Sequence, residues 1–145
     1  MAGSELEHVQ HVWANMKPNS PIYQLLLSDV DIISAGKGTI KAHLEVNAAH
    51  LNSKGTLHGT VSACLTDWAG GLAIASHGLE KTGLSTDIHT SYVSTAKEGD
   101  WLEVEGKASK VGNTLAFTTV TITKLVDMRP GPVVATGSHT KYVKQ

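Results

Sequence analysis

An apolar helix, predicted from about residue 58 to residue 77, constrains the fold of this chain more than any other segment. Its large apolar side chains recur with many small residues between them: Val61, Leu65, Trp68, Leu72 and Ile74. Gly78 follows as the expected C-terminal cap. Because the helix is apolar nearly all round, both of its sides must be covered. We expect a sheet on one side and a second copy of this 145-residue chain on the other, with Gly70-Gly71 allowing another backbone to approach closely.

Segments on either side of this helix show the period-two alternation that is typical of β-strands. The expected strands span residues 31–35, 39–46, 84–94, 101–111, 114–126 and 133–143, with turns at Gly36-Lys37-Gly38, Gly112-Asn113 and residues 128–132. Strands joined mainly by hairpins, with one helix among them, indicate an antiparallel sheet with a single helix on one face, which is an α+β architecture.

A helical segment at about residues 4–27 is expected to precede the sheet. Ser4 and Glu7 match an S-x-x-E capping box, which predicts that the first helix begins there. Pro18 ends that helix, and a short apolar piece follows at residues 22–27. The length fits a single domain covering residues 1–145.

Charge and cysteine content exclude several classes of protein. The formal net charge is -1 and Arg129 is the single arginine, so nucleic acid is not an expected partner. Cys64 is the single cysteine, which excludes an internal disulfide framework and indicates a reducing compartment. No apolar run approaches the roughly 20 residues of a membrane span. Without an apolar signal-peptide core near the N-terminus, the cytoplasm is the expected location, and a mitochondrion or another organelle stays open.

Asp67 is the unexpected residue in the apolar helix. An ionised carboxylate in apolar surroundings is unfavourable unless something compensates it. One interpretation is a partly exposed carboxylate, or one bonded to a neighbouring hydroxyl. The other is a general base or nucleophile, because desolvation raises the proton affinity of a carboxylate.

The start of the same helix has the features of an anion site. Its free backbone N–H groups and positive dipole end attract negative charge, and Gly59 allows close approach, so an oxyanion hole and an ordinary helix start are both open. His58 is either a structural cap or a group that polarises a carbonyl. Asn52 in the preceding loop has an amide that donates and accepts, although turns also favour asparagine. Ser85 alone says little.

Other candidate groups are interpreted structurally. His8 and His11 lie one turn apart but lack a third ligand nearby, so no metal site is expected. Cys64 is expected to be a small buried side chain, because nothing in the sequence places a base beside it.

Four segments together resemble the hotdog-fold acyl-CoA thioesterases, and most closely their PaaI-type group from phenylacetate degradation. The segments are NSKGTLHGTVSACLTD, GLSTDIHTSYVSTAKEGD, SKVGNTLAFTTVTI and ATGSHTKY. The resemblance covers about residues 36–142. It implies a hotdog core at about residues 28–143, in which an antiparallel sheet wraps around one long central helix.

The resemblance also implies roles for the candidate residues. Asn52 and the backbone N–H of Gly59 would polarise the thioester carbonyl, while Asp67 would activate the attacking water and Ser85 would hold it. His58 would belong to the same catalytic set. The family usually has His-Gly-Gly at the helix start, whereas this chain has Thr60 in place of the second glycine. That difference concerns the preferred acyl group more than the reaction.

Two segments and one tyrosine match positions that hold coenzyme A in the family. They are Tyr92, Val93, Ser94, Thr95, Ala96 and Lys97, then Lys110, Val111, Gly112, Asn113, Thr114 and Leu115, and finally Tyr142. Coenzyme A is part of the substrate, so no separate cofactor and no metal are implied. We expect a homo-oligomer, at least a dimer and, as a dimer of dimers, a tetramer.

Helix geometry favours a site shared between subunits. Gly59 and Asp67 are eight residues apart, so they lie about 12 Å apart along one helix. A carbonyl and the water that attacks it must approach within about 3 Å. A water-containing cleft between two subunits would therefore account for Asp67.

Two other functions stay open. The hotdog fold also hosts dehydratases and hydratases, for which His58 and Asp67 would have to form an acid–base pair. The chain is otherwise a non-catalytic acyl-CoA-binding module, although Asn52, Asp67 and Ser85 together exceed what binding alone requires. The fold by itself does not decide between these functions.

Overall fold

The computed structural model describes residues 2–144, and its N-terminal segment is helical as expected. The helix α1 spans Ala2–Met16, a 3-10 turn spans Lys17–Asn19, and α2 spans Pro21–Leu26. The capping box predicted at Ser4 is wrong, because α1 begins at Ala2 and the Ser4 backbone is already helical rather than extended as an N-cap requires.

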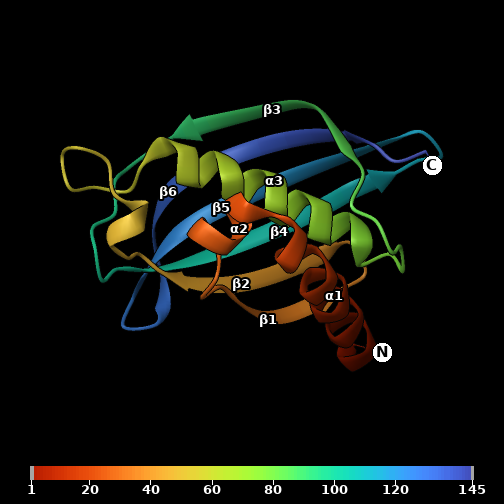
Figure 1. Cartoon of the computed structure of the whole chain (residues 1–145), viewed down its shortest axis with the longest axis horizontal. Helices are drawn as coiled ribbons and strands as arrows, with labels where there is room; N and C mark the ends of the chain where they lie inside the picture. The colour runs from red at the N-terminus through yellow and green to blue at the C-terminus, as the bar shows by residue number, and fades with distance from the viewer. Residues whose placement is uncertain (1, 145) are drawn as a thin grey trace.

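Six strands form one antiparallel sheet that curves around the central helix α3, Gly59–Ala75 (Figure 1). The strands are β1 Asp31–Gly36, β2 Thr39–Glu45, β3 Leu84–Tyr92, β4 Trp101–Val111, β5 Leu115–Val126 and β6 Arg129–Tyr142. Their order across the sheet is β1-β2-β4-β5-β6-β3. The predicted α+β architecture is confirmed, with two strands before the long helix in sequence and four after it.

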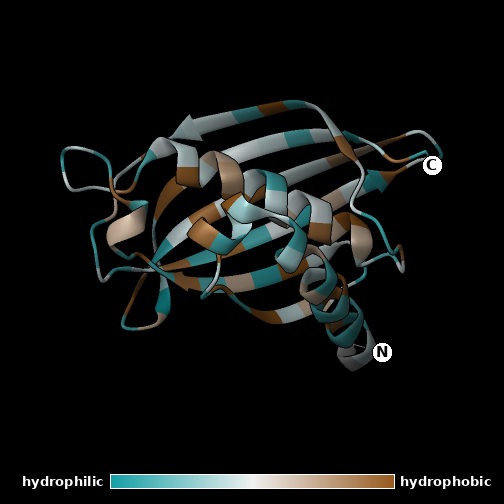
Figure 2. Cartoon of the chain, viewed as in Figure 1, coloured by the Kyte–Doolittle hydropathy of each residue, from teal (hydrophilic) through white to brown (hydrophobic). Residues whose placement is uncertain are grey.

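The core lies between α3 and the concave face of the sheet. Ile40, Ala42 and Leu44 of β2 are all buried, because alternate residues of a strand point to the same face. Figure 2 shows hydrophilic and hydrophobic residues interspersed along the strands of this sheet. Along α3, His58 is the N-cap, and Gly78 with φ of 97° lies two residues beyond the C-cap Ser76.

The close packing predicted at Gly70-Gly71 is confirmed, but the neighbours belong to the same chain. A Cβ on Gly70 would lie 2.6 Å from Thr118 Oγ1, and one on Gly71 would lie 2.9 Å from Thr82 Cβ. The helix therefore approaches its own sheet and the following loop at this point, rather than the backbone of a second copy.

The turn predicted at residues 128–132 is wrong. Asp127 and Met128 form the β5–β6 turn with positive φ angles of 53° and 59°, and β6 already begins at Arg129. Such angles are typical of a two-residue hairpin turn, although glycine or asparagine usually occupies it. Pro130 and Pro132 are tolerated because β3 pairs with β6 only from Ala135 onward, which leaves one side of this part of β6 without a strand.

The N-terminal segment covers the side of α3 that faces away from the sheet. The Trp13 ring packs edge-on against Trp68 with centroids 5.5 Å apart, and Trp68 is fully buried. We expected a second copy to cover this side, and the chain covers it with its own α1 and α2 instead. Among residues 2–144, no helix is both long and apolar enough to cross a bilayer.

Candidate active site

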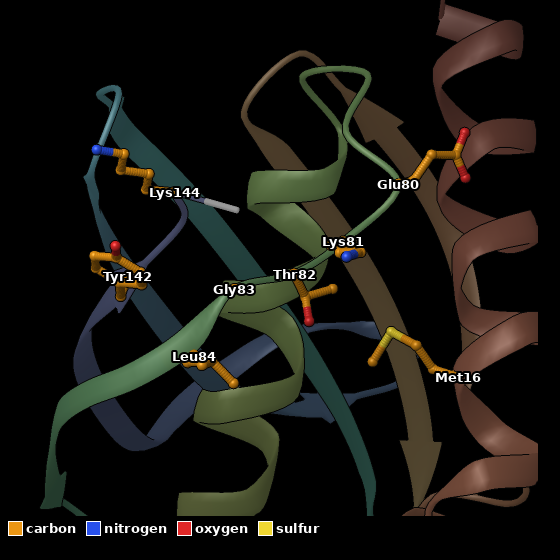
Figure 3. Close-up of a pocket in the computed structure, with 8 residues that line it drawn as sticks. All are labelled: Met16, Glu80, Lys81, Thr82, Gly83, Leu84, Tyr142 and Lys144. Carbon is orange, nitrogen blue, oxygen red and sulfur yellow. The ribbon is translucent and has the colours of Figure 1, made fainter.

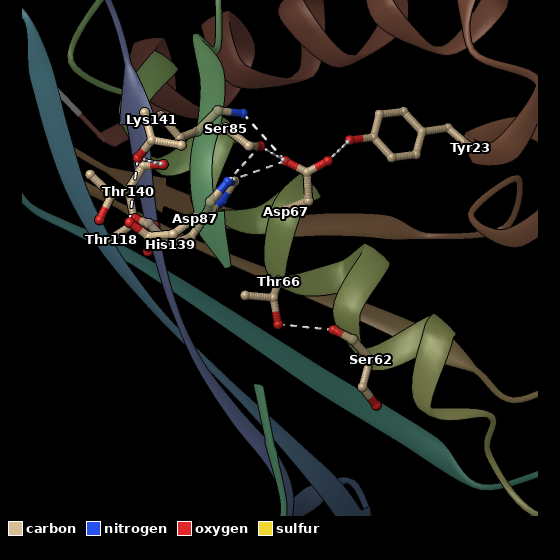
Figure 4. A network of polar contacts seen from close by, with 11 residues as sticks. Tyr23, Ser62, Thr66, Asp67, Ser85, Asp87, Thr118, His139, Thr140 and Lys141 are labelled. Atoms are coloured by element: carbon tan, nitrogen blue, oxygen red, sulfur yellow. Dashed lines mark hydrogen bonds and ion pairs between the residues drawn. The ribbon is translucent and has the colours of Figure 1, made fainter. Parts of the chain in front are cut away.

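The Asp67 carboxylate lies in a cluster of polar side chains from three other elements (Figure 4). Its Oδ1 accepts hydrogen bonds from Ser85 Oγ at 3.3 Å and Lys141 Nζ at 3.4 Å, and His139 Nε2 lies 3.6 Å away. Its Oδ2 accepts from the Tyr23 hydroxyl at 3.3 Å. The side chain remains 34% exposed. Asp67 is therefore compensated within its own chain while one part of it still faces solvent.

Strand register and two helix glycines bring these groups together. Ser85 of β3 pairs with Lys141 of β6, and His139 lies two residues along β6, so its side chain points to the same face. A Cβ on Gly71 would lie 3.2 Å from Lys141 Nζ, and a Cβ on Gly70 would lie 3.1 Å from His139 Nδ1. The missing side chains thus make room for a buried ammonium and a buried imidazole beside α3.

Burial shifts the protonation of the groups around Asp67. Desolvation lowers the pKa of Lys141 below its ordinary value, and the negative charge of Asp67 opposes this shift. Desolvation and the Lys141 charge also lower the pKa of His139. Burial, and then the charge of Asp67, raises the pKa of the Cys64 thiol to about 11. The side chain is partly buried, whereas full burial was expected.

Ser85 links His139 to Asp67. His139 Nε2 lies 2.7 Å from Ser85 Oγ, and the same oxygen donates its hydrogen to Asp67. With a neutral imidazole, this order of donors requires the hydrogen on Nε2. Ser85 is therefore oriented from both ends, and it lies beside Asp67.

A second group of candidate residues gathers at the N-terminus of α3. Asn52, Gly59, Tyr92, Ser94 and Thr95 line a cavity of about 230 Å³. The Tyr92 hydroxyl donates to the Gly59 carbonyl at 3.1 Å. This cavity brings the predicted oxyanion-hole residues together with the first of the predicted coenzyme A segments.

Local hydrogen bonds hold Asn52 and His58 in this group. Asn52 Oδ1 accepts from the Lys54 and Thr56 backbone N–H groups, and Nδ2 donates to Thr56 Oγ1 at 3.0 Å, which leaves a second Nδ2 hydrogen for a ligand. His58 Nδ1 accepts from Thr60 N at 3.0 Å as the N-cap of α3. Of the two interpretations of His58, the cap is the one observed.

The fold does not bring the two groups together within one chain. Gly59 and Asp67 remain on the same helix, eight residues or about 12 Å apart along its axis. Each chain therefore holds the predicted oxyanion-hole residues and the Asp67 cluster at separate places.

The sequence profile of the Thioesterase superfamily matches residues 54–142. This span is more than half of the chain and contains Gly59, Asp67 and Ser85. The chain belongs to the thioesterase superfamily. It is a thioester hydrolase, and the hotdog fold expected from the four sequence segments is confirmed.

Individual relatives agree with this assignment. Human acyl-coenzyme A thioesterase 13 is 32% identical over 121 residues, which cover 83% of this thioesterase and 84% of the human protein. The crystal structure of zebrafish thioesterase superfamily member 2 superposes with a TM-score of 0.81 and 34% identity, covering 92% and 93% of the two chains. A hypothetical thioesterase from Streptococcus pneumoniae, solved with coenzyme A, has a TM-score of 0.72 and 25% identity, covering 82% and 92%.

The predicted coenzyme A segments of this thioesterase lie at two places. Tyr92–Lys97 leads out of β3, and Val93 and Ser94 hydrogen-bond to the Val134 carbonyl. Ala96 is buried, so its side chain is not available to a ligand. Residues 110–115 form the β4–β5 hairpin turn, and Tyr142 pairs with its last residue.

A further cavity of this thioesterase lies beside the Asp67 cluster rather than around it. It has a volume of about 530 Å³ and is lined by Met16, Glu80, Lys81, Thr82, Gly83, Leu84, Tyr142 and Lys144 (Figure 3). The end of α1, the α3–β3 loop and the end of β6 meet there. Apart from Tyr142, none of its lining residues was predicted, because three distant segments form it.

Three members of the Asp67 cluster were missed from the sequence: Tyr23, His139 and Lys141. The strand pattern held a signal for two of them, because His139 and Lys141 alternate on the face of β6 that should be apolar. A buried lysine requires a partner, and Asp67 is the acidic residue in the helix expected to cover that face. Tyr23 gave no such signal. Within residues 2–144, no three His, Cys, Asp or Glu side chains gather where they could hold a metal ion.

Proposed function

We propose that this thioesterase hydrolyses acyl-CoA to a free acid and coenzyme A. The Asp67 carboxylate carries the proposal, because Ser85, Lys141 and Tyr23 hold it in place while it stays 34% exposed. A carboxylate held in this way is suited to take a proton from water. The human relative named acyl-coenzyme A thioesterase 13 and the pneumococcal thioesterase solved with coenzyme A support this class of substrate.

In the proposed reaction, water attacks the thioester carbonyl carbon while Asp67 takes a proton from the water. Ser85 helps to hold that water by fixing the carboxylate through its hydrogen bond to Oδ1. The carbonyl oxygen gains negative charge, which the Gly59 N–H at the positive end of α3 and the Asn52 amide stabilise. The carbon–sulfur bond then breaks, and coenzyme A leaves as a thiolate that takes up the proton. Because thiols have a pKa of about 8.5, this leaving group needs little acid catalysis.

The complete site is proposed to form between two copies of the chain. The carbonyl carbon and the attacking water must lie within about 3 Å of each other, and the two halves in one chain are about 12 Å apart. The strand β3 supports a dimer because it lies at an edge of the sheet, where β6 is its one partner among the described strands. Two of its side chains are largely exposed, Leu84 at 72% and Tyr92 at 60%. Exposed apolar side chains on an unpaired edge favour pairing with another strand. A dimer of such dimers would give the expected tetramer.

The phosphates of coenzyme A are proposed to meet Lys97 and Lys110. Both side chains are exposed, and they belong to the two segments that match the coenzyme A positions. The cavity lined by Asn52, Gly59 and Tyr92 would hold the thioester end of the substrate.

The dehydratase alternative has less support from this geometry. It requires His58 to act as an acid or a base with Asp67, but His58 Nδ1 already accepts the Thr60 N–H as the cap of α3, which leaves Nε2 alone for such a role.

Asp67→Asn tests the proposal directly. We expect the variant to fold and to bind an acyl-CoA substrate, but to lose about 10²–10⁴-fold in kcat, which is the usual contribution of a general base. Thiol release from a panel of acyl-CoA substrates gives the readout, and Ser85→Ala is the graded control. Ser85→Ala should be milder, because it removes one hydrogen bond and leaves the base in place. Near-normal kcat in folded Asp67→Asn would exclude the role of this carboxylate.

A further inference from the structure

We propose that Tyr23, from the N-terminal helix α2, is a positioning residue of the active site that aims Oδ2 of Asp67 at the attacking water. The inference rests on the proposed function, because it assigns a task to Tyr23 only if Asp67 takes the proton from water. It makes α2 part of the active site, whereas the four segments that resemble other thioesterases all lie outside α2.

Tyr23 points inward from α2, whereas two apolar side chains of the same helix stay exposed. Ser20 caps the helix by accepting from the Tyr23 N–H, and Pro21 begins it. On the resulting helix, Ile22 is 52% exposed and Leu25 is 64% exposed, while Tyr23 faces the interior. Leu26 and Leu27 lie on the same face as Tyr23 and are buried, so apolar packing sets this orientation of α2. The same orientation brings the Tyr23 hydroxyl to Asp67.

Aromatic packing holds the Tyr23 ring in this orientation. The ring meets Trp13 edge-on with centroids 5.7 Å apart, and Trp13 meets Trp68 in the same way at 5.5 Å. Edge-on pairs at these distances are favourable. Trp68 follows Asp67 on α3. The same group of three edge-on rings therefore fixes Tyr23 relative to the part of α3 that carries Asp67.

The hydrogen bonds of Asp67 identify which oxygen receives the water. An ionised carboxylate has about four acceptor sites, two on each oxygen. Ser85 and Lys141 occupy both sites on Oδ1, and His139 lies close to the same oxygen. Tyr23 occupies one site on Oδ2. The site left for water is therefore on Oδ2, immediately beside the Tyr23 hydroxyl.

Tyr23 stays a hydrogen-bond donor throughout the working pH range. Burial raises its pKa far above the ordinary value for tyrosine, and the negative charge of Asp67 adds to the shift. The hydroxyl therefore stabilises the ionised form of Asp67. The other titratable groups near this carboxylate are Cys64 on α3 and His139 and Lys141 on β6, and Asp87 on β3 acts on His139.

The test replaces Tyr23 in two ways in the full-length chain and measures kcat, KM and the pH dependence of kcat. Tyr23→Phe removes only the hydroxyl, and we expect kcat to fall about tenfold with KM changed less than about twofold, as for loss of a hydrogen bond to a charged group. Because the ionised carboxylate loses a donor, the acid limb of the pH profile should move to higher pH. Incorporation of 3-fluorotyrosine at position 23 keeps the shape and strengthens the donor, so the acid limb should move to lower pH.

Leu25→Ala is the matched control on the same helix, and it should leave kcat and the pH profile unchanged. An unmoved acid limb in both Tyr23 variants would overturn the proposal, even if Tyr23→Phe lowers Tm, because that result describes packing alone. A higher kcat in Tyr23→Phe would also overturn it, since Tyr23 would then shield Asp67. If Tyr23→Phe does not fold, the 3-fluorotyrosine profile decides.

Asp67→Asn separates this inference from the proposed function. If Asp67→Asn is inactive and Tyr23→Phe behaves as wild type, only the role of Tyr23 fails. If Asp67→Asn retains normal kcat, the proposed function fails first. In the Asp67→Asn background, Tyr23→Phe should cause no further loss, because the hydroxyl acts only through the carboxylate.

Discussion

Asp67 is tolerated in an apolar helix because its own chain surrounds the carboxylate with donors. Lys141 provides the opposite charge, and Ser85 and Tyr23 provide neutral hydrogen bonds. Breaking such a cluster by removing one partner leaves the others buried and unsatisfied, which usually costs more than the pair contributes. Substitutions at these residues should therefore be conservative in shape if they are to report on catalysis.

His139 predicts how stability depends on pH. Its pKa in the folded protein lies below the ordinary value of 6.5, mainly because of burial. As the pH falls below 6.5, the unfolded chain takes up a proton first, so the free energy of unfolding decreases until the folded-state pKa is reached. Within that window, wild type should lose up to about 1.4 kcal/mol per pH unit from this residue.

Chemical denaturation of His139→Gln between pH 8 and pH 5 would check this expectation. The variant should lose less stability on acidification than wild type, and His89→Gln, which alters an exposed histidine, should behave as wild type. A variant as acid-sensitive as wild type would assign the pH dependence to other groups.

At the scale of elements, α3 lies against the sheet at glycines. An added Cβ on Gly106 of β4 would lie 2.5 Å from the Ala69 carbonyl oxygen of α3, and a backbone atom cannot rotate away. Gly106→Ala should therefore push α3 from the sheet and destabilise the protein by about 2 kcal/mol, which lowers Tm by about 4–8 °C. Lys107→Ala on the exposed face of β4 is the control in the same thermal melt. Equal Tm values for the two variants would mean that the helix adjusts freely.

Lys97, in the loop after β3, and Lys110, near the end of β4, predict a salt-dependent affinity. If these exposed ammonium groups meet the phosphates of coenzyme A, Lys97→Ala/Lys110→Ala should raise KM severalfold at low ionic strength and have little effect at high ionic strength, where charges are screened. The value of kcat should hardly change, because these side chains are remote from the reacting carbon. An unchanged KM at low salt would place the nucleotide end elsewhere.

For the whole molecule, the separation of Gly59 from Asp67 predicts complementation between two inactive variants. If each site takes Asn52 and Gly59 from one chain and Asp67 from its neighbour, mixed dimers of Asn52→Ala and Asp67→Asn contain one intact site. Random association makes about half of the dimers mixed, so about a quarter of all sites should work. Thioester hydrolysis after joint refolding gives the readout. Mixed oligomers with only the activity of the single variants would place the site within one chain.

Local patterns in the sequence determined most of the elements. Period-two alternation predicted β2 and β4, and a run of small and apolar residues that ends near Gly78 predicted α3. Both predictions succeeded because these patterns depend only on neighbours in the chain. The β5–β6 turn was missed because Asp127 and Met128 adopt positive φ without a glycine, and Pro130 obscured the strand that follows.

Only the tertiary structure decided what surrounds Asp67. Tyr23 and Lys141 are 44 and 74 residues away from it in sequence, and neither contact follows from a local pattern. The Lys141 contact exists because β6 pairs with β3 in one register, and the Tyr23 contact exists because α2 folds back over α3. Asp67, the carboxylate proposed to act on water, was therefore visible in the sequence, whereas the charges and hydroxyls that surround it depend on packing between distant segments.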